Sequence, residues 1–240
     1  MIHFAKAATV VFAGDSITDG NRGLTMDCNH IFGHGYQTVI AGRLGSENLA
    51  MCPRFVNNAH SGWTLDQIYA RWDEEVLVFR PEIISILIGF NDAQKGFENH
   101  LTPEEVNRNY ETCFDELLNN TRKALPSSRI ILMEPFFLPS SVADPFEYVP
   151  HPRYNEAYDI YRRSVEQDEY LTDTVKRLSK TVRIMTERHG CIFVPLSKTL
   201  QEAAKFSGEP YLVWDGIHPT IVGHELIARQ WISAVEVEMV

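Results

Sequence analysis

Short apolar runs of strand length alternate along this chain with amphipathic helical patterns, and this alternation constrains the fold more than any other feature. The runs occupy residues 8–13, 55–57, 83–88, 130–133 and 191–194. The clearest of them, Ile83–Ile88, is almost continuously apolar instead of alternating between apolar and polar residues. Continuous apolarity is typical of strands that are buried on both faces, so the runs predict a parallel sheet.

The segments between these runs carry apolar residues at steps of three and four, as helices do. They cover residues 65–79, 106–118 and 175–185, and a fourth follows the last run at 221–235. Pro81 ends the first pattern, Thr102-Pro103-Glu104-Glu105 reads as a capping box before the second, and Gly190 reads as a left-handed cap after the third.

Strands that alternate with helices through right-handed crossovers predict an α/β fold, a three-layer α/β/α sandwich. About five parallel strands fit the flavodoxin-like order 2-1-3-4-5. We find no internal repeat and no low-complexity linker, so we expect residues 1–240 to form a single domain. The irregular segment 135–163 is rich in Pro and Tyr, and we interpret it as a lid, a partner surface or packed surface decoration.

The charge and cysteine content disfavour several classes of function. A formal net charge of -10 argues against nucleic acid or an anionic membrane as partner, because both attract Lys and Arg. Cys28, Cys52, Cys113 and Cys191 show no CxxC spacing, which indicates free thiols and not a zinc site or a disulfide framework. The start of the chain lacks the pattern of a secretory signal, and no apolar run reaches the ~18 residues of a membrane span, so we expect a cytoplasmic protein.

The stretch "TVVFAGDSITDG", residues 9–20, raises the question of what Ser16 does. Three roles are open locally: a turn residue, a hydroxyl in a phosphate loop, or a nucleophile. The stretch lacks G-x-G-x-x-G and Gly-Lys-Ser/Thr, which disfavours the phosphate loop. The chain also lacks the G-x-S-x-G elbow of the α/β-hydrolases, so a nucleophilic Ser16 needs partners from elsewhere.

The predicted strand order brings such partners to one end of the sheet. Strand 1 lies between strands 2 and 3, so the loops that follow these three strands converge where doubly wound sheets bind ligands. Those loops carry Gly14-Asp15-Ser16, Asn57–Gly62 and Gly89–Asp92. A hydroxyl, a glycine amide and the carboxamide of Asn91 can therefore meet.

A base for Ser16 is available near the end of the chain, in Trp214-Asp215-Gly216-Ile217-His218-Pro219. An Asp and a His three residues apart can face each other, with the carboxylate on Nδ1–H and Nε2 directed outward. Pro219 disfavours helical geometry at His218, which should therefore precede the last helix. A metal site on Asp215 and His218 would need His224 as third ligand, inside that helix, so we expect no metal and no cofactor.

Gly-Asp-Ser, the later Ser-Gly, Gly-x-Asn-Asp and Asp-x-x-His, in this order, resemble the four blocks of the SGNH (GDSL-type) hydrolases over nearly the whole chain. The segments "GDSITDGNRG", "ARWDEEVLVFRPEIISILIGFND", "IILMEPF" and "WDGIHPTIVGHELIA" are most similar to the branch of acetylxylan-type carbohydrate esterases. The resemblance implies a nucleophile at Ser16 and His218 as base, oriented by Asp215. It also implies an oxyanion hole made of the Ser16 and Gly62 amides and the Asn91 side chain.

We therefore expect a serine esterase that hydrolyses short-chain acetyl esters of a carbohydrate. Asp15, Trp63 and Trp214 are expected to contact the substrate, with core packing an open alternative for Trp214. Two other functions stay open: a thioesterase or lysophospholipase with an apolar channel at 136–138, and a non-catalytic sugar-binding module. The expected partner is a small-molecule ester, and the sequence leaves a homo-oligomer open.

The residues around the candidate oxyanion donors also predict the acyl preference. Bulky side chains flank Gly62 within His60–Trp63, and Phe90 precedes Asn91. We expect them to narrow the acyl side of the site. Asp19 and the pair Asn21-Arg22 should border a wider and more polar alcohol side.

Overall fold

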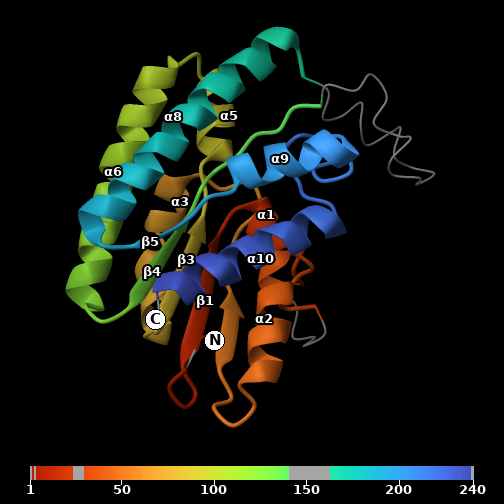
Figure 1. The fold of residues 1–240 in the computed structure, drawn as a ribbon. Helices are drawn as coiled ribbons and strands as arrows, with labels where there is room; N and C mark the ends of the chain where they lie inside the picture. Colours follow the sequence, from red (N-terminus) through yellow and green to blue (C-terminus); the bar gives the residue numbers. More distant parts are fainter. Residues whose placement is uncertain (1, 3, 24–29, 141–162, 239–240) are drawn as a thin grey trace.

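The computed structural model describes residues 2, 4–23, 30–140 and 163–238, and it contains one sheet of five strands in the order β2-β1-β3-β4-β5 (Figure 1). The strands are β1 (Thr9–Gly14), β2 (Arg54–Asn57), β3 (Ile83–Leu87), β4 (Arg129–Met133) and β5 (Ile192–Val194). All neighbouring strands are parallel, which confirms the predicted order. Every residue of β1 and β3 is buried, as their continuous apolarity predicted.

Helices cover both faces of the sheet, which gives the predicted three layers (Figure 1). On one face α6 packs along α8, with α3 and α5 against them; on the other α2 packs against α10, and α9 lies beside α10. The helices are α1 (Ser16–Asp19), α2 (Tyr36–Glu47), α3 (Leu65–Tyr69), α4 (Trp72–Glu75), the 3-10 turn η1 (Leu77–Phe79), α5 (Phe90–Glu98), α6 (Pro103–Ala124), α8 (Val165–His189), α9 (Ser197–Ser207) and α10 (Ile221–Glu238). In the part of the chain described here, no helix has the length and apolarity needed to cross a membrane.

The predicted helix signals are confirmed at two places. Thr102 caps α6 in a capping box with Glu105, and Pro103 is the first helical residue. Gly190 ends α8 in the left-handed conformation, at φ 59°.

The prediction of one helix over residues 65–79 is wrong. The structure divides this stretch into α3, α4 and η1. In a continuous helix the carbonyl of Glu75 would accept the N–H of Phe79, but it accepts Nδ2 of Asn58 at 2.6 Å, and the Phe79 N–H bonds to Val76 instead. The loop after β2 therefore takes a carbonyl that the helix would need, and a tertiary contact overrides the apolar periodicity.

The structure also contains helices that the sequence did not predict: α1, α2, α5 and α9. Gly42 and Gly45 interrupt the pattern of α2, and α9 buries only Leu200. Most of the segment 135–163 lies outside the described residues, so its role as a lid or partner surface stays a prediction.

Candidate active site

Ser16 is the first residue of α1, directly after β1, so its hydroxyl lies at the carboxyl end of the sheet. Gly14 is required by a close approach, since a Cβ there would lie 2.3 Å from the carbonyl oxygen of Leu87 in β3. Asp15 caps the helix by accepting the N–H of Ile17 on Oδ1 at 3.1 Å. The close packing at Gly14 and the cap by Asp15 thus fix the turn that carries Ser16.

A continuous hydrogen-bonded chain connects Ser16, His218 and Asp215. Ser16 Oγ lies 2.8 Å from His218 Nε2, and His218 Nδ1 lies 2.6 Å from Asp215 Oδ2. The other oxygen of Asp215, Oδ1, accepts the backbone N–H groups of Ile217 at 2.9 Å and His218 at 2.7 Å. Asp215 is buried, with 5% of the residue exposed, and these three hydrogen bonds fix the orientation of its carboxylate.

The electrostatics at His218 favour a proton acceptor at Nε2. The Asp215 carboxylate accepts the proton of Nδ1, which leaves the lone pair of Nε2 for the Ser16 hydroxyl. Burial alone would lower the pKa of His218, but the hydrogen bond and charge of Asp215, with the charge of Asp15, raise it above its ordinary value. The histidine thus becomes more basic than a free imidazole.

The loop that carries Asp215 and His218 is held by several backbone contacts. Val213 and Pro219 form an antiparallel bridge across the turn, and the guanidinium of Arg163 donates to the carbonyl of Asp215 at 2.6 Å. As predicted from Pro219, His218 lies ahead of the last helix, α10.

The two other predicted oxyanion donors lie on the loop after β2 and on α5. Gly62 has φ +81°, a left-handed conformation that favours glycine, and it is exposed. Its neighbour Ser61 lines the same cavity as Ser16. The sequence predicted Asn91 in a loop, but the structure places it in the first turn of α5. There its Nδ2 donates to the carbonyl of Trp63 at 3.0 Å. One N–H of this carboxamide therefore positions the Gly62 loop, and the second has no acceptor among the described residues.

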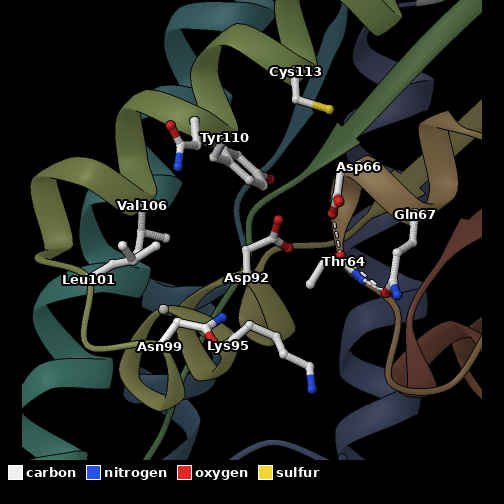
Figure 2. A pocket seen from close by; sticks show the side chains of 12 residues that line it. Thr64, Asp66, Gln67, Asp92, Lys95, Asn99, Leu101, Val106, Tyr110 and Cys113 are labelled. Atoms are coloured by element: carbon white, nitrogen blue, oxygen red, sulfur yellow. Dashed lines mark hydrogen bonds between the residues drawn. The ribbon is translucent and has the colours of Figure 1, made fainter.

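Asp92, next to Asn91, holds the same loop from a second side. Its two oxygens lie 3.1 and 3.3 Å from the backbone nitrogen of Leu65. Figure 2 shows this carboxylate directed into a second cavity of about 430 Å³, with Asp66 and Tyr110 on its walls. Burial, reinforced by the charges of Asp66 and Asp15, raises the pKa of Asp92 to about 7. These contacts satisfy the backbone N–H of the first residue of α3 and brace the end of the loop that precedes it.

The three predicted substrate-binding residues lie in different environments. Asp15 is 2% exposed, and burial raises its pKa to about 6; its contact with substrate stays a prediction, and this burial argues against it. The ring of Trp63 stacks on His60 with centroids 3.8 Å apart. Trp214 stacks beside His218 at 5.9 Å and lines the cavity next to Ser16, where a substrate can reach it.

The cavity beside Ser16 has a volume of about 300 Å³ and a mostly polar wall. Its lining residues are Ser16, Ile17, Asp19, Gly20, Asn21, His34, Ser61, Trp214, His218, Pro219 and His224. The sequence analysis considered His224 only as a possible metal ligand. The signal for His224 was its place on the helix that follows His218. Within the described ranges no three His, Cys, Asp or Glu side chains cluster as metal ligands do.

Comparison with known proteins assigns the chain to a family. Residues 12–226 match the GDSL-like lipase/acylhydrolase family. The chain belongs to this family. It is a GDSL-type carboxylic ester hydrolase, and the resemblance drawn from its sequence motifs is confirmed.

Individual relatives of this GDSL-type hydrolase span almost its whole length. An acetylxylan esterase from Geobacillus stearothermophilus is 28% identical over 239 residues, covering 96% of this chain and 95% of the relative. A crystal structure of Axe2, an acetylxylan esterase from the same organism, has a TM-score of 0.77 at 25% identity and covers 98% of this chain and 96% of its own. LAE5, an alpha/beta hydrolase enzyme from the metagenome of Lake Arreo, has a TM-score of 0.75 at 26% identity, with 97% of both chains covered.

Proposed function

We propose that this GDSL-type hydrolase removes acetyl groups from a carbohydrate through a covalent acyl-enzyme on Ser16. The observation that carries the proposal is the connected geometry of Ser16, His218 and Asp215, at 2.8 and 2.6 Å. A serine hydroxyl is a weak nucleophile unless a base accepts its proton, and this arrangement supplies an oriented base. Crystal structures of Axe2 include catalytic mutants at a serine, an aspartate and a histidine, which supports the same three residue types here.

In the first half of the reaction Ser16 Oγ attacks the ester carbonyl carbon while its proton moves to His218 Nε2. The C–O bond to the alcohol then breaks, and His218 returns the proton to the leaving alkoxide. In the second half His218 takes a proton from water, the resulting hydroxide attacks the acetyl-serine, and acetate leaves as Ser16 recovers its proton. The Asp215 carboxylate stabilises the imidazolium in both halves of the reaction.

The carbonyl oxygen gains negative charge in both halves, and three N–H groups are proposed to receive it. They are the amides of Ser16 and Gly62 and the free N–H of the Asn91 carboxamide. Because Asn91 and Asp92 hold the Gly62 loop at Trp63 and Leu65, the donors are positioned before substrate binds. Donors oriented in advance toward developing charge make a large contribution to catalysis of acyl transfer.

The choice of an acetylated sugar rests on the shape and polarity of the site. The cavity of about 300 Å³ suits a small polar alcohol. The side chains that would line a long acyl channel pack elsewhere. Phe136 and Leu138 are buried in the core, and the ring of Phe137 lies under the Arg163 guanidinium. Relatives described as an acetylxylan esterase and an acetyl-xylooligosaccharide esterase favour the same class of substrate.

A labelling experiment with acetate release tests this function. We expect a fluorophosphonate probe to modify wild type at Ser16, identified by peptide mass spectrometry, and wild type to release acetate from acetylated xylo-oligosaccharides. Ser16→Ala should lose both, while Ser46→Ala, at an exposed helix serine, should keep both. Failure of the probe to label wild type would favour the non-catalytic sugar-binding module.

A further inference from the structure

His224 is a buried histidine that no step of the proposed reaction uses. It lies in the first turn of α10, only 7% exposed, and it lines the same cavity as Ser16 and His218. Its Nδ1 accepts the backbone N–H of Tyr36 at 3.1 Å, at the start of α2. A contact between two helices therefore fixes the orientation of the ring.

That contact also decides which ring nitrogen carries the proton. A nitrogen that accepts a hydrogen bond carries a lone pair, so the neutral ring must hold its proton on Nε2. Burial, together with the charges of His34 and His218, lowers the pKa of His224 to about 4, so the ring is neutral near pH 7. His224 is thus a single-tautomer N–H donor.

The Nε2–H group has no acceptor in the described part of the chain. His224 accepts the bond from Tyr36 and makes an edge-on ring contact with His34. Its Nε2 makes no hydrogen bond to a described residue, and it is not sealed from solvent. A donor on a residue this buried is costly unless water or a ligand accepts from it. The cavity is the space from which such an acceptor can come.

The other side chains of the cavity indicate what kind of molecule would bring the acceptor. Asp19 offers a carboxylate, paired with Arg22 at 3.3 Å, and Asn21 offers an amide. Trp214 adds a flat aromatic wall. The carboxylate of Asp19 disfavours an anionic ligand. Hydrogen-bond donors and acceptors beside an aromatic ring suit a neutral alcohol with several hydroxyl groups.

We propose that His224 is a specificity-determining residue, whose Nε2–H donates to a hydroxyl or ether oxygen on the alcohol part of the ester. The proposal rests on the proposed carbohydrate esterase function and adds a named donor to it. The residue contacts the alcohol and not the reacting carbonyl, so it selects among acetate esters by their alcohol.

Two amide substitutions separate this role from a structural one. In His224→Asn the side-chain oxygen can still accept from Tyr36, but nothing reaches the position of Nε2. In His224→Gln the amide nitrogen can reach the position of Nε2, but the acceptor for Tyr36 is lost. The substrates are a singly acetylated methyl xyloside and cyclohexyl acetate, which share the acetyl group and a six-membered ring but differ in the oxygens of the alcohol.

The measurement is the ratio of kcat/KM for the xyloside to kcat/KM for cyclohexyl acetate. We expect His224→Asn to lower this ratio about five- to tenfold, the effect of one lost hydrogen bond, and His224→Gln to keep a higher ratio than His224→Asn. The same two substitutions at exposed His100 serve as controls. Circular dichroism and fluorophosphonate titration count the folded, active molecules of each variant.

Two results would overturn the donor role: an unchanged ratio in His224→Asn, or a ratio in His224→Gln at or below that of His224→Asn. Failure of the proposed function has a different signature, because wild type itself would then release no acetate from the xyloside. In that case the ratio is measured with glycerol monoacetate and propyl acetate. It must still fall in His224→Asn, or the donor role is rejected.

Discussion

Asp92 accepts the backbone N–H of Leu65 at 3.1 Å, and this bond ties the start of α5 to the start of α3, directly after the loop that carries Gly62. The preceding residue, Asn91, donates to the carbonyl of Trp63 at 3.0 Å. The consecutive side chains of Asn91 and Asp92 therefore hold the segment 63–65, Asn91 as a hydrogen-bond donor and Asp92 as an acceptor. The loop proposed to stabilise the oxyanion is held by the same turn that supplies the third donor.

Asp92→Asn should change how the stability of the fold depends on pH. Burial raises the pKa of Asp92 from 3.8 to about 7, so between these values the folded protein holds a proton that the unfolded chain releases. Wild-type stability should therefore fall as pH rises from about 4 to 7. Asparagine keeps an oxygen for Leu65 and cannot ionise, so the Tm of the variant relative to wild type should be higher at pH 8 than at pH 5.

Thermal unfolding at the two pH values measures this difference, which we expect to reach several degrees. Asp73→Asn is the control, because Asp73 is exposed on α4 and its variant should show the same offset at both pH values. Asp15, with a pKa raised to about 6, should keep part of the pH dependence in both variants. A constant offset for Asp92→Asn would show that Asp92 does not bind the extra proton.

Asn91→Ala should lower kcat more than it raises KM. The free N–H of its carboxamide is proposed to act on charge that exists mainly in the transition state, so substrate binding depends less on it. Loss of one such donor typically costs about a hundredfold or more in kcat. Asn119→Ala on the exposed side of α6 is the matched control. A change confined to KM would reassign Asn91 to substrate binding.

The sheet was predictable because its signals are local. Strands buried on both faces must be continuously apolar, and Ile83–Leu87 is buried at every position. Helix boundaries were predictable where a cap is encoded, as at Thr102 and Gly190. The break between α4 and η1 was not, because it depends on Asn58, which binds the carbonyl of Glu75 from another loop.

The candidate site divides in the same way. Strand order marked Ser16, and the i, i+3 spacing marked Asp215 and His218. The structure brings the three side chains together, at 2.8 and 2.6 Å, and their catalytic roles stay a prediction. The bracing role of Asp92 depends on its contact with a backbone N–H 27 residues away. The donor on His224 depends on the Tyr36 N–H, 188 residues away, which no sequence pattern encodes.

Asp215→Asn should reduce activity strongly and move the acid limb of the pH–rate profile to lower pH. The hydrogen bond and charge of Asp215 raise the pKa of His218 against the opposing effect of burial. His218 must be neutral to accept the Ser16 proton, so activity should rise through a pKa above 6.5 in wild type and through a lower one in the variant. A profile of kcat/KM against pH checks this, with Asp173→Asn on exposed α8 as control. An acid limb that does not move would contradict the assignment of Asp215.

The last prediction concerns the acyl group of the ester. We expect the enzyme to prefer acetyl over longer acyl groups. An apolar channel would add about 0.8 kcal/mol, about fourfold in kcat/KM, for each methylene it buries. The described residues offer no such channel. Phe136 is 2% exposed and Leu138 is 8% exposed, and His60 stacks with Trp63 beside Gly62. The cavity next to Ser16 is instead polar, with Asp19 in its wall.

A chain-length series separates the two kinds of site. We expect kcat/KM on 4-nitrophenyl esters to fall from acetate through butyrate to octanoate, and acetate to be released from acetylated xylo-oligosaccharides. Trp63→Ala should make the decrease in kcat/KM with chain length less steep, because it removes the ring that is predicted to narrow the acyl side. Phe206→Ala, at an exposed position, should leave the series unchanged. A rise through octanoate with no acetate released from any sugar would reject the carbohydrate esterase and favour a thioesterase or lysophospholipase, because only a site that buries the chain gains from each methylene.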